Sequence, residues 1–529
     1  MERSPHHVVT TLEDRWRDLE IDYHRAYWDS QVDATPANEQ KLVETELELR
    51  RAKGDPEALA AVQSALDEGV HDAALQRQLE ILRLSLTGNQ MDEARRAELV
   101  ELSSAVESDF ASYRPEVKGR RLNDNDIEEV LKHSDDEDER RRAWEGSKEI
   151  GGVVADRVRE MARLRNAVAH DLGFADYYNM SLELQELSEE WLFETLAEVE
   201  SATDEPYRQW KADLDARLSA RFGTNELRPW HYSDPFFQQL PTEGRNAHVD
   251  GLLGDADAIE LARKTFSAWG FDLSGVMEAG DLYPRERKNQ HAFCLDVDRS
   301  GKDVRILANV VPGERWVSVL LHESGHAAYD VSIDRGLPYL LRRCAHLLTT
   351  EAMALLCGRL VRNPRWLIDV AGAESVEVES VIGSLEAATI AEKLLFARWT
   401  LAVVHFERAL YADPEADLDG RWWEVVERFQ LVSPPPDRAA PDWAAKIHIA
   451  AAPVYYQNYL LGELFAAQLE ATCERECGGL VGVPEAGALL AQRLFAPGAL
   501  MRWDVLVEEA TGKPLAPADF AASLTSVAL

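Results

Sequence analysis

The sequence predicts a mainly α-helical fold with a small β element. Near the N-terminus, apolar residues recur at steps of three and four: Leu12, Trp16, Leu19, Tyr23 and Tyr27. This spacing places their side chains on one face of a helix, and similar patterns continue along the chain. Sequence typical of strands is scarce. Its best example is 293–307, where Gly301 and its polar neighbours can turn a hairpin.

Start and stop signals support three of the predicted helices. Thr10 and Thr11 can cap the first. The second is predicted from regularly spaced leucines: Leu75, Leu79, Leu82 and Leu86. Gly88 is its stop signal. In the charged run 135–142 acids come first and arginines follow, so Ser134 is expected to cap a third, solvated helix.

Composition limits the classes of function. The chain has 529 residues, of which 46% are hydrophobic, so it can bury a large core. Its net charge of −37 argues against nucleic acid or an anionic membrane as a partner. Five cysteines are few for this length and fit reduced thiols in a cytoplasmic protein. The N-terminal segment has no apolar core, and no apolar run is long enough for a membrane span, so neither a signal peptide nor a span is expected.

The most informative motif is His322-Glu323-Ser324-Gly325-His326. It lies in an apolar stretch after Pro312-Gly313, and Glu314 falls where the first turn of a helix favours an acid. Residues four apart share one face of a helix, so both imidazoles can bind one zinc ion. Glu323 is then placed as the general base of a zinc metallopeptidase. A pair of hydrogen-bonded core histidines is the alternative.

A third protein ligand is needed, because hydrolytic zinc takes three and leaves one position for water. Four downstream side chains are candidates: Asp330, Asp334, His346 and Glu351. Glu351 lies in the middle of a second apolar, helix-like segment, 340–360, where an acid is costly unless it binds a charge. This position favours Glu351 over the two aspartates as the third ligand, and His346 remains a candidate.

The segment 446–459 combines Lys446, His448 and three tyrosines within a short apolar stretch. Peptide hydrolysis needs hydrogen-bond donors for a tetrahedral oxyanion. It also profits from a cation that holds a substrate carboxylate. The segment offers both kinds of group. Half-buried core tyrosines with satisfied hydroxyls are the alternative interpretation.

With these segments in view, the chain resembles the angiotensin-converting-enzyme family of zinc peptidases, nearly from end to end. The matching motifs in chain order are Ala143-Trp144-Glu145-Gly146 (AWEG), His291-Ala292 with 301–306 (HAxxWD…GKDFRI), 322–326 (HEMGH), 341–352 (LRRGA…HEA), Trp422-Trp423 with Phe429-Gln430 and Pro434-Pro435 (WW…YQ…PP), and 446–449 (KFHI). Each motif is modest evidence, but their order and spacing together are specific.

The resemblance implies a single catalytic peptidase domain over 1–529. Its fold is a two-lobed helical ellipsoid with the lobes interleaved in sequence. A deep central substrate channel lies between the lobes, with the small β element near the zinc site.

The resemblance also assigns catalytic roles. One zinc ion (Zn2+) is held by three side chains: His322, His326 and Glu351. Glu323 acts as base and later as acid. His448 and Tyr459 stabilise the oxyanion.

Four further residues contact the peptide substrate in this comparison. His291 and Ala292 align its backbone. Lys446 and Tyr456 hold its C-terminal carboxylate. The segment carries one residue more than the family pattern, so Tyr455 is a rival to Tyr456.

The chain departs from the family at several positions. Leu355 stands where the family has an aspartate that supports a zinc histidine, so Asp330 or a water is expected to take over that support. The glutamine that grips the substrate carboxylate is not evident in the corresponding region, 229–234. Val426 and Asn458 replace the arginines that hold chloride in animal members, and no chloride activation is expected.

These inferences predict zinc-dependent hydrolysis of peptide bonds in short peptides, as a peptidyl-dipeptidase or a related carboxypeptidase or oligopeptidase. The partner is a short peptide substrate, with no nucleic acid and no membrane, and the oligomeric state is left open. A zinc enzyme acting on a small non-peptide substrate is one alternative. An inactive peptide-binding relative is the other.

Overall fold

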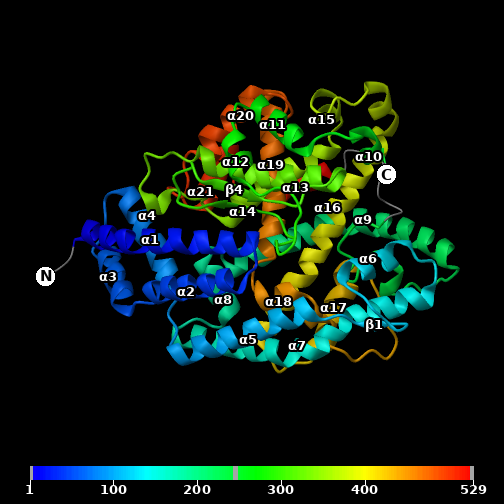
Figure 1. Cartoon of the computed structure of the whole chain (residues 1–529), viewed down its shortest axis with the longest axis horizontal. Helices are drawn as coiled ribbons and strands as arrows, with labels where there is room; N and C mark the ends of the chain where they lie inside the picture. The colour runs from blue at the N-terminus through cyan, green and yellow to red at the C-terminus, as the bar shows by residue number, and fades with distance from the viewer. Residues whose placement is uncertain (1–3, 242–247, 525–529) are drawn as a thin grey trace. The chain divides into compact units, whose positions relative to one another are not determined.

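The computed structural model describes residues 4–241 and 248–524, and helices make up most of them (Figure 1). The strands of the described residues form two separate antiparallel pairs. The predicted mainly α-helical class is therefore confirmed. No helix within these two ranges combines the length and apolar character needed to cross a membrane.

The chain forms two compact units that alternate along the sequence. The first unit comprises Met1–Gln90, Ala247–Leu385 and Leu461–Phe520, and the second comprises Met91–Asn246, Glu386–Leu460 and Ala521–Leu529. Two helices, α16 (Ser375–Ala412) and α19 (Gln457–Cys477), begin in one unit and continue into the other. The single catalytic domain and its deep channel stay predictions of the family resemblance.

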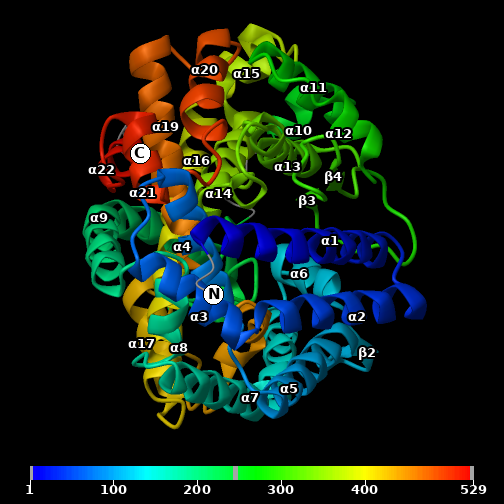
Figure 2. The ribbon, with the colours of Figure 1, turned by 90° about the vertical axis from the view of Figure 1, so that its left-hand side faces the viewer.

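The first unit contains the N-terminal helices and the segments around the 322–326 motif (Figures 1 and 2). Its helices and strands are α1 (Pro5–Val32), α2 (Pro36–Lys53), α3 (Pro56–Asp67), α4 (Ala73–Thr87), α10 (His248–Leu253), α11 (Ala258–Ala268), α12 (Ser274–Ala279), β3 (Phe293–Asp296), β4 (Val304–Leu307), α13 (Glu314–Ser332), α14 (Leu347–Gly358), α15 (Pro364–Asp369), α20 (Pro484–Leu489) and α21 (Trp503–Thr511).

The second unit contains the segment 446–459. Its helices and strands are α5 (Glu93–Ser112), β1 (Glu116–Val117), β2 (Arg120–Arg121), α6 (Asp124–His133), α7 (Glu137–Asp171), α8 (Tyr177–Leu184), α9 (Glu189–Phe222), α17 (Leu418–Gln430) and α18 (Ile447–Ala451). The last helix of the chain, α22 (Ala518–Ser523), begins in the first unit and ends in the second.

The predicted helix caps are partly wrong. α1 begins at Pro5, and its cap is Ser4, because Thr10 and Thr11 lie inside the helix. Ser134 ends α6, and Asp136 caps α7 by accepting from the Glu139 backbone N–H. In both helices the N-cap is a polar residue other than the one predicted from the sequence. The predicted stop of α4 at Gly88 is confirmed.

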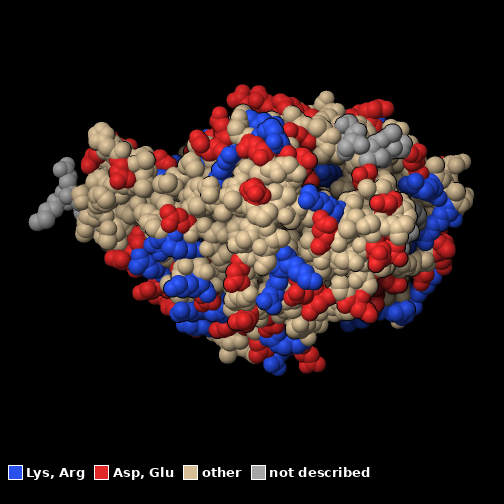
Figure 3. Space-filling view, turned by 90° about the horizontal axis from the view of Figure 1, so that it is seen from above, with Lys and Arg blue, Asp and Glu red and all other residues tan. Residues whose placement is uncertain are grey.

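Acidic and basic side chains are mixed over the face shown in Figure 3. The chain has a net charge of −37. On the face shown, its acidic residues are spread among basic ones and do not form a single acidic patch.

The predicted hairpin is confirmed as β3 and β4. Phe293 pairs with Leu307 and Asp296 with Val304, in antiparallel register. Gly301 lies in the connecting turn with φ +69°, a left-handed conformation that favours glycine. The hairpin packs on α13, the helix that carries the 322–326 motif.

Two glycines allow close packing on both sides of α14. A Cβ at Gly325 of α13 would lie 2.9 Å from the Ala354 Cα atom of α14. A Cβ at Gly462 of α19 would lie 3.1 Å from the Glu351 Cβ atom. Contacts below 3 Å with backbone cannot be accommodated without a shift, so glycine at 325 sets the distance between α13 and α14.

We expect Gly325→Ala to destabilise the protein by about 1–3 kcal/mol, because the added methyl group must push α14 away from α13. The same shift should weaken zinc binding. Urea unfolding and a zinc-binding titration measure the two effects. Gly275→Ala in α12 is the matched control, since its Cβ meets nothing within 4 Å. Equal behaviour of the two variants would contradict the packing argument.

Candidate metal centre

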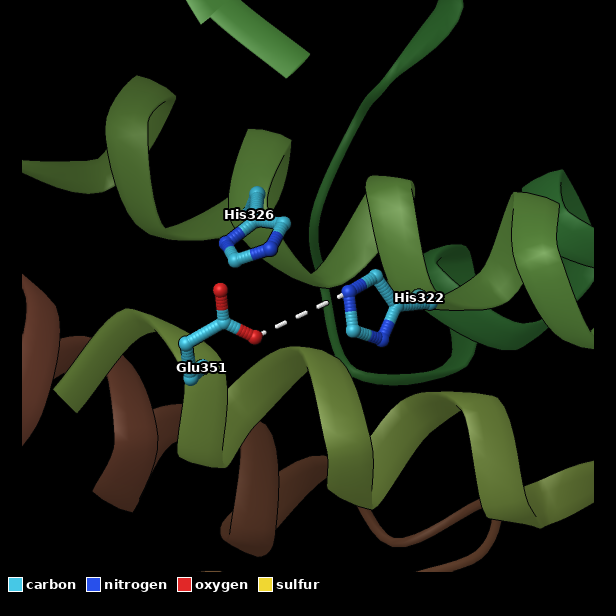
Figure 4. Close-up of side chains that lie close together, drawn as sticks. All are labelled: His322, His326 and Glu351. Carbon is cyan, nitrogen blue, oxygen red and sulfur yellow. Dashed lines mark ion pairs between the residues drawn. The ribbon is translucent and has the colours of Figure 1, made fainter. Parts of the chain in front are cut away.

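Two helices of the first unit bring a metal-binding group of side chains together. His322 and His326 come from α13, and Glu351 comes from α14 (Figure 4). One donor atom of each lies within 4.8 Å of the others. The His322 Nε2 atom is 3.9 Å from the Glu351 Oε2 atom. Figure 4 shows the two rings and the carboxylate turned toward one another.

A hydrogen bond orients each imidazole. The Nδ1 atom of His326 lies 2.6 Å from the Oγ1 atom of Thr350. The ring of His322 is hydrogen-bonded to the backbone carbonyl of Ala354. Such partners fix the ring and its tautomer and strengthen metal binding. This contact with Thr350 was not foreseen from the sequence, and the support expected from Asp330 or a water stays a prediction.

The histidines are held in the neutral form that binds metals. Burial lowers the pKa of His322 to about 4. Burial, together with the neighbouring His322, also holds the pKa of His326 well below its usual value. Two neutral imidazoles and one carboxylate match the His₂Glu set of hydrolytic zinc sites. The residues present therefore fit a zinc ion.

Glu323 lies beside this group without belonging to it. Its side chain is buried. Burial, and then the charge of Glu351, raise the pKa of Glu323 to about 8. The backbone N–H of Cys294 in β3 donates to the Glu323 carboxylate. The small hairpin thus fixes the predicted general base next to the predicted ligands.

The other candidates for third ligand lie elsewhere. His346 caps α14, and its Nδ1 atom accepts from the Leu348 backbone N–H at 3.0 Å. Asp334 is exposed and accepts from the Gly336 backbone N–H at 2.8 Å. Asp330 stays on α13, outside the group of close donors. Of the four, only Glu351 is placed with the histidines.

His291 and Ala292 directly precede β3. The His291 side chain is exposed, and its backbone N–H donates to the Asn289 Oδ1 atom at 2.9 Å. Ala292 is half-buried. Both residues therefore lie next to the strand whose Cys294 contacts Glu323.

In the second unit, Lys446 lies in a box of aromatic rings. Its Nζ atom is 5.3 Å from the ring centre of Trp399, 5.5 Å from that of Phe236 and 5.8 Å from that of Tyr456. Burial lowers the pKa of Lys446 to about 8. Rings at these distances attract a cation but do not neutralise it.

A glutamine does contact this lysine. The Nζ atom of Lys446 donates to the Gln238 Oε1 atom at 2.8 Å. Gln238 lies just beyond the region, 229–234, in which the sequence comparison found no carboxylate-gripping glutamine. The sequence gives little indication of this contact, because 208 residues separate Gln238 from Lys446.

Tyr456 lies at the centre of an aromatic cluster. Its ring centre is 5.3 Å from that of His448 and 5.7 Å from that of Tyr459. The Tyr455 ring centre is 5.2 Å from that of Tyr459. Because the Lys446 Nζ atom lies over Tyr456, the geometry favours Tyr456 over Tyr455 as the partner of Lys446.

The two positions compared with chloride-binding arginines are uncharged. Val426 is buried in α17. The Asn458 amide donates to the Gln185 Oε1 atom at 2.8 Å.

A family model described as angiotensin-converting enzyme matches residues 2–229 and 286–518. The match includes the metal-binding group and the segment 446–459, and it leaves out 230–285, which contains Gln238. The curated proteins contain no match to the chain.

We expect Thr350→Val to raise the dissociation constant of zinc by about tenfold, because the isosteric valine cannot bond the His326 Nδ1 atom. Competition with a chelator of known affinity measures the change. Thr349→Val is the control, since the Thr349 hydroxyl bonds the His346 carbonyl oxygen instead. If both variants bind zinc as tightly as the wild type, Thr350 has no supporting role.

Proposed function

The chain belongs to the angiotensin-converting enzyme family, a family of zinc metallopeptidases, and from this premise we propose that it hydrolyses peptide bonds in short peptides. A peptidyl-dipeptidase, or a related carboxypeptidase or oligopeptidase, is the proposed class. The observation that carries the proposal is the convergence of His322, His326 and Glu351 beside Glu323.

Glu323 is the proposed proton carrier. The three side chains would hold a zinc ion, whose Lewis acidity would activate water and polarise a carbonyl. The Glu323 carboxylate takes a proton from the attacking water and delivers it to the leaving amine. The Cys294 N–H favours the ionised form of that carboxylate. His291 and Ala292, which precede β3, are proposed to align the substrate backbone.

His448 and Tyr459 of the second unit are the proposed donors to the oxyanion. Their rings flank Tyr456 in one cluster. An imidazole N–H and a phenol O–H held in a fixed position can stabilise the charge that develops on the carbonyl oxygen.

Lys446, Gln238 and Tyr456 are the proposed site for the C-terminal carboxylate of the substrate. The charge of the buried Asp234 offsets the burial of the Lys446 ammonium only in part, so a substrate carboxylate would be bound favourably there. The Gln238 oxygen accepts from Lys446, so its amide NH₂ remains as a donor. This set supports cleavage near the C-terminus of a peptide.

The grounds for a non-peptide substrate are weaker than the sequence suggested. That alternative depended on the missing glutamine and on Leu355. Gln238 lies on Lys446, and Thr350 supports His326. The position of the buried Glu323 beside the metal-binding group supports the proposal of an active enzyme over that of an inactive relative.

We expect Tyr459→Phe to lower kcat by about 100- to 1,000-fold with little change in KM, since one oxyanion donor contributes about 3–4 kcal/mol in comparable sites. Steady-state kinetics on a short peptide measure both constants. Tyr455→Phe, which alters the neighbouring ring, is the control and should retain kcat. An effect confined to KM would remove Tyr459 from this role.

We expect a C-terminal amide to reduce kcat/KM by about tenfold or more relative to the free acid, the scale of one charged hydrogen bond. Lys446→Met should abolish the difference between the two peptides, and Gln238→Leu should reduce it. Paired kinetics on one peptide in both forms provide the test. Equal cleavage of the two forms by the wild type would instead indicate an endopeptidase.

A further inference from the structure

The turn between α18 and α19, residues 452–456, contains an unusual backbone. Val454 has φ +55°, in the left-handed region. A β-branched side chain is rare there, because its methyl groups crowd the backbone, and the conformation persists only where surrounding contacts impose it. The turn follows α18, the helix that contains His448, and it includes Tyr456 and leads to Tyr459.

Side chains from distant segments hold both peptide groups of Val454. Its N–H donates to the Glu407 Oε1 atom at 2.9 Å. Its carbonyl oxygen accepts from Gln185 Nε2 at 3.0 Å and from Gln457 Nε2 at 2.7 Å. Just before the turn, Arg165 Nη2 donates to the Ala450 carbonyl oxygen at 3.1 Å. The turn is therefore fixed by side chains from α7, α16 and α19 and by the residue that ends α8.

Glu407 is the member of this group whose burial costs free energy. It lies on α16, is 1% exposed, and its Oε2 atom has no hydrogen-bond partner among the described residues. Burial raises the pKa of Glu407 to about 8, and the Val454 N–H and Arg165 offset this only in part. Tyr178, Tyr411 and Tyr456 are the other titratable groups close to it. An apolar residue would avoid the cost of burying a carboxyl group.

We infer that Glu407 is a positioning residue, which holds the Val454 turn so that His448 and Tyr459 keep the orientation needed for oxyanion stabilisation. The inference rests on the proposed function for the roles of those two residues. The main support for the inference is the hydrogen bond from the Val454 N–H to Glu407. This bond fixes the strained Val454, which lies between His448 and Tyr459 in the sequence.

Two substitutions separate the hydrogen bond from the bulk of the side chain. Glu407→Gln keeps an acceptor for the Val454 N–H, and Glu407→Leu removes it at similar volume. We expect Glu407→Leu to lower kcat by about 10- to 100-fold while KM stays within about threefold, the effect of a small misplacement of catalytic groups. Glu407→Gln should keep most of the wild-type kcat. Should the leucine variant fail to fold, Glu407→Asp, one methylene shorter, replaces it with the same expectation.

Hydrogen exchange gives a readout that does not depend on peptidase activity. We expect exchange across 447–458 to be faster in Glu407→Leu than in the wild type, with Glu407→Gln close to the wild type. Glu20→Ala is the matched control. Glu20 is a buried acid of the first unit that pairs with Lys53 and Arg299, and its loss should reduce stability without affecting the turn.

Equal kcat and equal exchange for the glutamine and leucine variants would overturn the inference. So would a Glu20→Ala variant that reproduces the kinetic and exchange changes of Glu407→Leu. A wild-type enzyme that cleaves no peptide would contradict the proposed function and the catalytic role of the turn, while the exchange comparison would still decide whether Glu407 holds Val454.

Discussion

The close approach of α13 to α14 is the constraint on which the candidate metal centre depends. His322 and His326 are fixed relative to one another by the helix that carries them, but Glu351 comes from a different helix. The two helices meet where Gly325 faces the backbone of Ala354. A larger residue at this point would separate the carboxylate from the imidazoles. The absence of a side chain at Gly325 therefore allows the side chains of His322, His326 and Glu351 to meet.

Burial at this contact also sets the protonation states. The low dielectric of the interior disfavours charge on the two imidazoles and lowers their pKa values. The same burial, with the charge of Glu351, raises the pKa of Glu323. Each ring is oriented by a group on α14, the Thr350 hydroxyl or the Ala354 carbonyl. The second helix thus supplies one of the proposed ligands and positions the other two.

Local patterns predicted much of this arrangement from the sequence. Each of the predictive features is visible within a short stretch of sequence. They are the two histidines four residues apart in 322–326, the acid in an apolar segment and the strand-like run 293–307. Gln238 and Thr350 were missed for physical reasons. Gln238 acts through a contact with Lys446, 208 residues away, and lies in the stretch, 230–285, outside the family match. Thr350 is an ordinary helix residue whose position beside a ligand was the only available signal.

The central claim is that α13 and α14 together bind one zinc ion that serves peptide hydrolysis. Diffraction data collected at the zinc absorption edge from crystals of Glu323→Gln, soaked with zinc, test it most directly. The account predicts a single strong anomalous peak bounded by His322, His326 and Glu351, in a protein that binds a short peptide without cleaving it. A peak at other residues, or zinc that disappears with the Glu323 substitution, would contradict the account.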